Sequence, residues 1–330
     1  MELTGLPDCS APMPWHIDAW NRITGQVNSG RLPHALMLVG AAYTGLDRLA
    51  LALARLLLCE APQGGLNCGY CHACELSASG AHGDFLWLQP EDKSRVIKID
   101  QVRTAVALAQ QTASFGERKV IVLSPAEVMN AAAANALLKS LEEPAPGTHM
   151  VLTCSQLHAV PATIRSRCQL LKLPVPSRGQ SLAWLDQVTG DRGSSERLLD
   201  LCDGLPLLAE TMFREPHSEQ LHAARLACRG LFGGQLPVGE VIELLAGSPV
   251  PEVLDQLITS MQRTLSALDA EALSGAGARR GFALLDELGE LRLAVEGGAN
   301  PNAQLLAEVL VGKVQDLLGA LSPDDSMGQR

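Results

Sequence analysis

Apolar positions change their spacing abruptly within residues 35–58, ALMLVGAAYTGLDRLALALARLLL. The first five residues form an apolar run of strand length that stops at Gly40. After Gly45, leucine and alanine recur every three or four residues as far as Leu57, which is the spacing of one helical face. The pattern therefore predicts a strand, a loop that contains two glycines, and a helix in direct succession.

The same two spacings alternate through the first half of the chain. Helical spacing predicts an N-terminal helix at 14–31 and further helices at 101–111 and 131–141. Apolar runs predict five strands, at residues 35–39, 85–88, 120–123, 150–154 and 169–173. Parallel strands that alternate with helices are joined by crossovers. We therefore expect an α/β module with a parallel five-stranded sheet covered on both faces.

The second half of the chain carries only helical signals. A proline-rich joint at residues 173–177, LPVPS, is followed by a short helical segment that includes residues 182–188. From residue 215 onward, glycine and proline pairs separate helical patterns typical of a five-helix bundle. We therefore expect three domains: an α/β module at 1–175, a small helical lid at 176–215, and an all-α domain at 216–330.

Composition and charge narrow the class of protein. The chain has 330 residues, of which 47% are hydrophobic and only 3% aromatic, a balance that favours a helix-rich protein. A net charge of −10 opposes broad attraction to nucleic acid, although the chain could still reach nucleic acid through a local basic face or a partner. No apolar run is long enough to span a membrane, and residues 1–15 lack the pattern of an export signal. We expect a cytoplasmic protein without membrane contact.

Four of the nine cysteines, Cys59, Cys68, Cys71 and Cys74, follow the spacing C-x8-C-x2-C-x2-C. This spacing predicts a structural, tetrahedral Zn²⁺ site at 59–74, in which every coordination position is taken by a thiolate. The surrounding insertion is too small to bury its own core, so a metal can supply its stability. Alternatives are His72 in place of one ligand, haem attachment at Cys68-x-x-Cys71-His72, a redox pair, and unrelated buried thiols.

The loop after the first strand has the glycines of a phosphate-binding P-loop without its functional side chains. Gly40 and Gly45 are separated as in G-x-x-x-x-G-K-[ST], in which lysine pairs with phosphate and the hydroxyl binds Mg²⁺. The corresponding residues are Leu46 and Asp47. Leucine brings no charge, and aspartate places a carboxylate where phosphate would lie. This degenerate P-loop predicts that the chain binds no ATP.

A second nucleotide motif is also altered. P-loop ATPases place an acidic residue directly after an apolar strand, where it holds Mg²⁺. Here the strand at 120–123 is followed by Ser124-Pro125, and we interpret Glu127 as a surface acid at the turn. ATP hydrolysis by this chain is therefore not expected. The alternative is an active ATPase with atypical motifs, which ATP binding by the purified chain would reveal.

Two further motifs carry a resemblance to a known family. Residues 130–144, NAAAANALLKSLEEP, and residues 163–168, TIRSRC, resemble the AAA+ clamp-loader subunits of bacterial DNA polymerase III. The degenerate P-loop together with the four-cysteine insertion is similar to the delta-prime branch of that family. The motifs that carry the similarity lie between about residue 14 and residue 172. Beyond that it rests on the architecture of a lid followed by a helical collar.

The resemblance implies a function in DNA replication. Loaders of this family are hetero-pentamers of gamma/tau-type ATPase subunits, a delta subunit and a delta-prime subunit, and they place the sliding clamp on primed DNA. ATP binds between subunits, and an arginine of the Ser-Arg-Cys motif reaches the γ-phosphate held by a neighbour. In this chain that arginine is Arg167, within Ser166-Arg167-Cys168, and Arg165 is the competing candidate. A planar guanidinium suits phosphate charge.

The resemblance also implies what this chain does not do. The lid of the family often carries an ATP-sensing arginine, but the corresponding stretch at residues 202–208, CDGLPLL, has none. A subunit of the DNA polymerase III holoenzyme that does not hydrolyse ATP itself is therefore implied. It would supply an arginine finger in trans and assemble through a helical collar at 216–330.

Overall fold

The computed structural model describes residues 6–91, 94, 96–214, 223–234 and 236–321. The chain divides into two compact units, residues 1–210 and 211–330. The boundary falls inside one helix, α9 (Pro206–Arg214). The separation of the α/β module and the lid into two domains stays a prediction.

The first unit contains the expected parallel sheet of five strands. They are β1 (Ala35–Val39), β2 (Phe85–Leu88), β3 (Lys119–Leu123), β4 (Thr148–Cys154) and β5 (Gln169–Lys172). The spatial order is β2-β3-β4-β1-β5, and every neighbouring pair is parallel. The predicted fold class is confirmed, and each predicted strand end lies within two residues of the observed one. This order brings the carboxyl ends of β1, β3 and β4 side by side.

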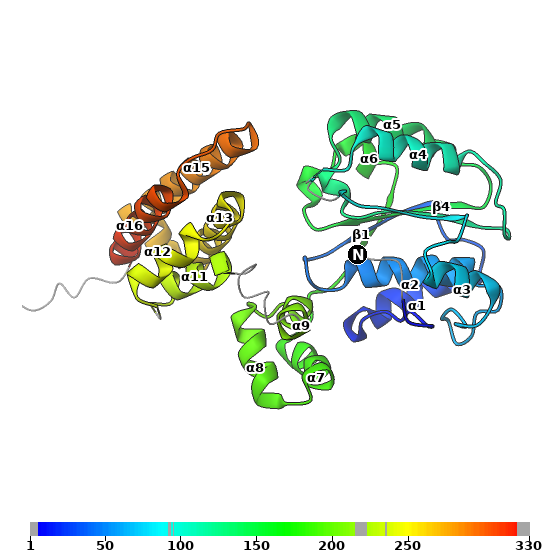
Figure 1. Ribbon diagram of the computed structural model, residues 1–330, viewed down its shortest axis with the longest axis horizontal. Helices are drawn as coiled ribbons and strands as arrows, with labels where there is room; N and C mark the ends of the chain where they lie inside the picture. The colour runs from blue at the N-terminus through cyan, green and yellow to red at the C-terminus, as the bar shows by residue number, and fades with distance from the viewer. Residues whose placement is uncertain (1–5, 92–93, 95, 215–222, 235, 322–330) are drawn as a thin grey trace, which may run out of the picture. The chain divides into compact units, whose positions relative to one another are not determined.

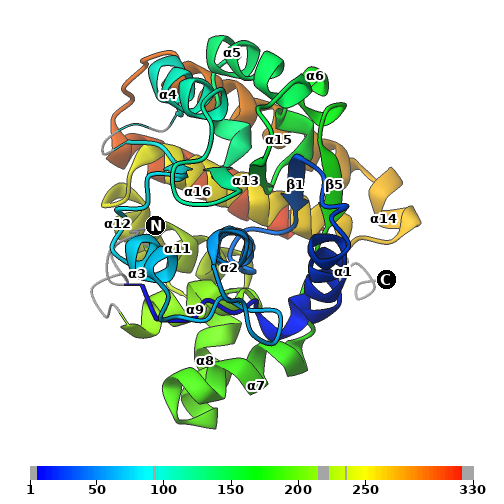
Figure 2. The same ribbon diagram turned by 90° about the vertical axis from the view of Figure 1, so that its right-hand side faces the viewer.

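Helices cover both faces of this sheet (Figure 1, Figure 2). On one face lie α1 (Ile17–Asn28), α2 (Leu46–Leu58) and α3 (His72–Ala78). On the other lie α4 (Ile99–Ala109), α5 (Ala131–Glu142) and α6 (Ala162–Arg165). The predicted N-terminal helix is divided into a 3-10 turn, η1 (Pro14–His16), and α1. After β5 come α7 (Arg178–Thr189), α8 (Arg192–Leu201) and α9.

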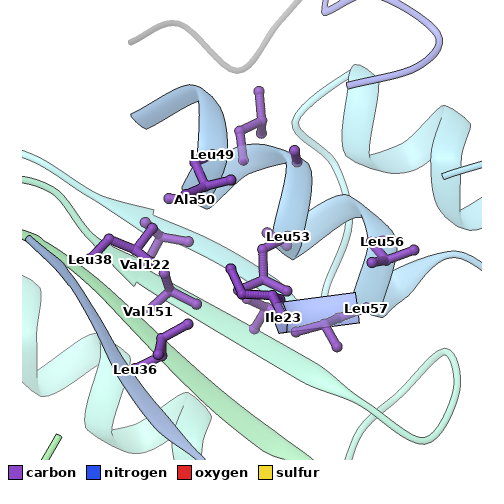
Figure 3. Close-up of a cluster of buried hydrophobic side chains, with 14 of the residues drawn as sticks. Ile23, Leu36, Leu38, Leu49, Ala50, Leu53, Leu56, Leu57, Val122 and Val151 are labelled. Atoms are coloured by element: carbon purple, nitrogen blue, oxygen red, sulfur yellow. The ribbon is translucent and has the colours of Figure 1, made fainter. Parts of the chain in front are cut away.

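Successive residues of the strands belong to two separate apolar cores. Leu36 and Leu38 of β1 point toward α2 and pack in one cluster with Leu49 and Leu53 (Figure 3). Met37, between them, belongs to a second cluster built with α4 and α5. Because both faces are buried, the strands are apolar at nearly every position. This is why short apolar runs located them well.

The second unit is helical throughout its described residues. Its helices are α11 (Ala223–Phe232), α12 (Val238–Ala246), α13 (Val250–Ser266), α14 (Ala270–Ser274), α15 (Ala276–Glu296) and α16 (Ala303–Leu321). All of these except α14 contribute buried side chains to an apolar core of their own. The sequence predicts five helices, and α14 is additional, because the Asp269 carboxylate accepts a hydrogen bond from the backbone N–H of Ala272 and begins a new helix. No helix within the described residues is long and apolar enough to cross a membrane.

Candidate functional site

The four clustered cysteines converge between the end of α2 and the start of α3. Their Sγ atoms all lie within 4.8 Å of one another. The Cys59 and Cys71 sulfurs are 3.9 Å apart, and those of Cys68 and Cys74 are 4.0 Å apart. A tetrahedron with Zn–S bonds of about 2.3 Å has S–S edges of about 3.8 Å, whereas a disulfide requires about 2.0 Å. The four thiols therefore fit a tetrahedral metal ion.

Backbone donors already surround these sulfurs. The N–H of Cys68 donates to Cys59 Sγ at 3.2 Å, and the N–H of Cys71 donates to Cys68 Sγ at 3.4 Å. Burial raises the pKa of the Cys59 thiol to about 12. A cation at the centre would offset this penalty by stabilising the thiolate. His72 is exposed and sets its ring edge against Phe115, outside the cluster of four sulfurs.

Arg55 ties the cysteine cluster to α2 and to an N-terminal segment, residues 6–13. Its side chain is almost fully buried, with 1% of the residue exposed, and burial lowers its pKa. It donates five hydrogen bonds, to the carbonyl oxygens of Pro7, Asp8 and Cys74 and to the hydroxyls of Ser10 and Ser77. No sequence motif points to this residue, although an arginine inside an otherwise apolar helix stretch is a usable signal.

Asn67 adds a second link between the N-terminal segment and the cysteine cluster. Its Oδ1 accepts from the backbone N–H of Ser10 at 2.8 Å, and its Nδ2 donates to the Asp8 carbonyl at 2.9 Å. The same Nδ2 lies 3.4 Å from Cys74 Sγ. Gly69 packs so closely here that an added Cβ would lie 3.0 Å from the Asp8 carbonyl oxygen. The cysteine cluster and residues 6–13 therefore share one hydrogen-bonded unit.

Replacing Arg55 with methionine is expected to destabilise the protein by about 3 kcal/mol or more, because buried carbonyl oxygens lose their donors while the space stays filled. The free energy of unfolding in urea would measure this change. Arg22→Met on the exposed face of α1 is the control, and a surface change of this kind shifts stability by less than about 0.5 kcal/mol. Equal stability of the two variants would contradict the structural role of Arg55.

The degenerate P-loop, residues 40–47, is packed with the chain's own side chains. Gly45 has φ +98°, and a Cβ added there would lie 2.5 Å from Met13 Cγ. Leu46, at the position of the phosphate-binding lysine, turns inward and joins the core beneath α2. Trp15 Nε1 donates to the Thr44 carbonyl at 2.8 Å. The loop keeps the glycine geometry of a phosphate site, but its side chains make an apolar core contact.

Asp47 is hydrogen-bonded across the ends of the sheet. The Ser124 hydroxyl, directly after β3, donates to Asp47 Oδ1. Thr153 of β4 in turn donates to Ser124 Oγ at 2.8 Å. P-loop ATPases place a hydroxyl at the end of the loop and a carboxylate after the strand. Here the two groups are exchanged, and they bond to each other.

The interpretation of Glu127 as a surface acid is wrong. Glu127 is half-buried, and its Oε1 accepts from both the backbone N–H and the hydroxyl of Ser155, at 2.8 and 2.5 Å. Its Oε2 is buried and makes no hydrogen bond with a described residue. Since Ser155 directly follows β4, Glu127 connects the turns after β3 and β4. The sequence separation between the two residues concealed this contact.

Arg48, in the first turn of α2, connects the loop region to the helices after β5. It pairs with Glu210 of α9, whose side chain is 8% exposed, and its guanidinium carbon lies 5.6 Å from the ring centroid of Trp184 in α7. Trp184 meets Trp15 edge-on at 5.9 Å. The N–H of Leu207 also donates to a carbonyl of the P-loop, that of Tyr43. These contacts hold α7 and α9 beside α2.

Arg167 lies between α6 and β5, which is one of the two edge strands of the sheet. Its side chain is 33% exposed. The guanidinium pairs with the carboxylate of Glu142, at the end of α5, and Nη1 donates to the Thr163 carbonyl at 2.9 Å. Arg165 is half-buried, and its buried Nε makes no hydrogen bond with a described residue. Both arginines of the motif are therefore half-buried, and they differ in that the Nε of Arg167 is hydrogen-bonded to Glu142.

Comparisons with known proteins agree on one family. The family described as "DNA polymerase III, delta subunit" matches residues 15–177. DNA polymerase III subunit delta' of Pseudomonas aeruginosa is 34% identical over 93% of this chain and 98% of its own length. The subunit delta' of Yersinia pestis is 37% identical over 66% of this chain and 65% of its own. That of Escherichia coli K12 is 34% identical over 71% and 69%.

Proposed function

Because the chain belongs to the delta-prime subunit family of DNA polymerase III, we propose that it is a clamp-loader subunit that does not itself hydrolyse ATP. In this proposal it assembles in the cytoplasm with gamma/tau-type ATPase subunits and a delta subunit. The complex then places the sliding clamp on primed DNA. The helical domain at 216–330 would form the contacts of the collar.

The observation that carries the proposal is the bond between Asp47 and Ser124. Asp47 lies where an active ATPase needs a hydroxyl, and Ser124 lies where it needs a carboxylate. Leu46 is buried in place of a phosphate-binding lysine. Met13 packs against Gly45, and a nucleotide would bring its phosphates against the Asp47 carboxylate. The geometry thus supports a subunit whose own nucleotide site is closed.

Contacts between α2 and the helices after β5 support the same function. They are the ion pair of Arg48 with Glu210 and the packing of Arg48 on Trp184. We infer that α7 and α9 keep one position against α2 while neighbouring subunits cycle through ATP. The subunit would then act as a stator.

In the proposal, the chain contributes to catalysis at a neighbour's site. Arg167 would place positive charge beside the γ-phosphate of ATP bound by an adjacent ATPase subunit. Its position at the edge of the module and its 33% exposed side chain support this role, whereas the Nε of Arg165 is buried. The four cysteines would hold one structural Zn²⁺, which has no open position for water and so takes no part in the chemistry.

The isolated chain is expected to show no Mg²⁺-dependent ATP binding at millimolar nucleotide, because neither the lysine nor the metal-binding pair is present. Equilibrium dialysis with labelled ATP measures this directly. The gamma/tau-type subunit, tested in the same buffer, is the positive control. Tight Mg²⁺-dependent binding by this chain would instead support the alternative of an active ATPase with atypical motifs.

A further inference from the structure

We propose that Glu142 is a positioning residue for Arg167, holding its guanidinium in the orientation that meets an oxyanion on the neighbouring subunit. This inference rests on the role in trans proposed for Arg167. It concerns a residue that carries no chemistry of its own. Glu142 lies 25 residues before Arg167 in the chain, and the two meet only because α5 ends beside the turn after α6.

The hydrogen bonds of Arg167 divide its guanidinium into a held edge and a remaining edge. Nε donates to Glu142 Oε1 at 2.6 Å, and Nη2 pairs with the same oxygen. Nη1 donates to the Thr163 carbonyl at 2.9 Å and lies 3.4 Å from Ser166 Oγ. A guanidinium has five N–H donors. These contacts with described residues leave one N–H on Nη2, and the second N–H on Nη1 donates only the long hydrogen bond to Ser166 Oγ. A phosphate that displaces the Ser166 hydroxyl would therefore meet two terminal donors, which match two of its oxygens.

Glu142 is well placed to serve as a fixed reference. It is the last residue of α5, and the preceding residue, Leu141, is buried with 1% exposure. The carbonyl oxygen of Leu141 accepts a hydrogen bond from His34 Nε2 at 2.7 Å, which anchors this end of the helix next to β1. The carboxylate thus projects from a backbone held by the core, whereas Arg167 lies in a turn.

Stability alone does not account for this ion pair. The two side chains are 33% and 48% exposed, and pairs that accessible contribute little to folding. Orientation is a different matter, because a flexible arginine side chain samples many rotamers unless its guanidinium is held. A carboxylate on one edge removes most of these rotamers before the neighbour binds ATP. The side-chain entropy is then lost before the reaction step, so its loss does not add to the activation barrier.

The test uses a reconstituted loader in which only the ATP site served by this chain is competent for hydrolysis. Glu142→Ala is expected to lower kcat for ATP by roughly 10- to 100-fold, the range expected for a displaced catalytic group, with little change in KM. Glu142→Gln should recover most of the rate, since its amide oxygen still accepts from Nε and Nη2. Glu143→Ala, which removes the next exposed carboxylate, should leave kcat unchanged.

Several results would overturn the inference. Normal or faster turnover with Glu142→Ala would show that the carboxylate is idle or competes with phosphate for Arg167. A loss of assembly or thermal stability that parallels the loss of rate would assign Glu142 a purely structural role. Arg167→Ala separates the two levels of the proposal. If it has no effect, the arginine finger itself is wrong, whereas if it slows turnover and Glu142→Ala does not, only the positioning role fails.

Discussion

Replacing Cys71 with serine is expected to release bound zinc and to unfold residues 60–79. Free energies of zinc binding in small thiolate sites are about 10–16 kcal/mol, and this binding is also folding energy. The insertion between α2 and β2 has only a short helix, α3, and the four sulfurs converge at its start. Metal analysis should fall from about one zinc per chain to none. Hydrogen exchange should become fast throughout the insertion.

The effect should extend to the N-terminal segment, residues 6–13. Asn67 and Arg55 bind this segment and Cys74 together, so loosening the cysteine cluster removes the support for both. The amide of Ser10, which donates to Asn67, is a local reporter and should lose its protection. Exchange in the strands β1 and β4 should stay slow, because both lie in the core of the sheet.

Cys9→Ser is the matched control, because Cys9 is exposed and lies outside the cluster of four sulfurs. It should keep both the metal and the slow exchange. The same preparations decide between the alternatives for this motif, since haem attachment or a redox centre would give a visible absorption spectrum or a two-electron titration without zinc. A metal-free preparation that melts and exchanges like the untreated protein would exclude a structural metal.

Elements buried on both sides were predictable from the sequence. Apolar runs located all five strands, because a central parallel strand shows the same apolar character on each face. The clustering of the four cysteines was also predictable, since close C-x-x-C spacing acts through a local turn. The convergence of the four sulfurs supports that interpretation directly. These features depend on residues that are near one another in the chain.

The missed contacts depend on strand order, which local patterns do not contain. Asp47 meets Ser124, and Glu127 meets Ser155, only because β1, β4 and β3 are neighbours in the sheet. A degenerate motif predicts that a function is absent, but it does not show which distant side chains pack against the loop, as Met13 does at Gly45. Arg55 was overlooked for a similar reason, since its acceptors lie up to 48 residues away.

Replacing Arg167 with alanine is expected to reduce ATP hydrolysis at the neighbouring site by a factor on the order of 10³–10⁵, the range for arginine fingers. This corresponds to a barrier higher by about 4–7 kcal/mol. The reason is electrostatic, because charge on the phosphoryl oxygens must be stabilised as the γ-phosphate transfers. DNA- and clamp-stimulated ATPase, measured in the reconstituted loader with one competent site, should fall together with clamp loading.

Two variants separate the finger from less specific effects of charge. Arg167→Lys should restore little activity. An ammonium keeps the charge, but it lacks the planar fork that can bond the Glu142 carboxylate on one edge and a phosphate on the other. Arg165→Ala should reduce turnover far less, because the Nε of that side chain is buried and is not available to a phosphate. Assembly should be unaffected by Arg167→Ala if the domain at 216–330 carries the oligomer contacts. Complexes that contain Arg167→Ala and still load clamps at the normal rate would rule out the finger.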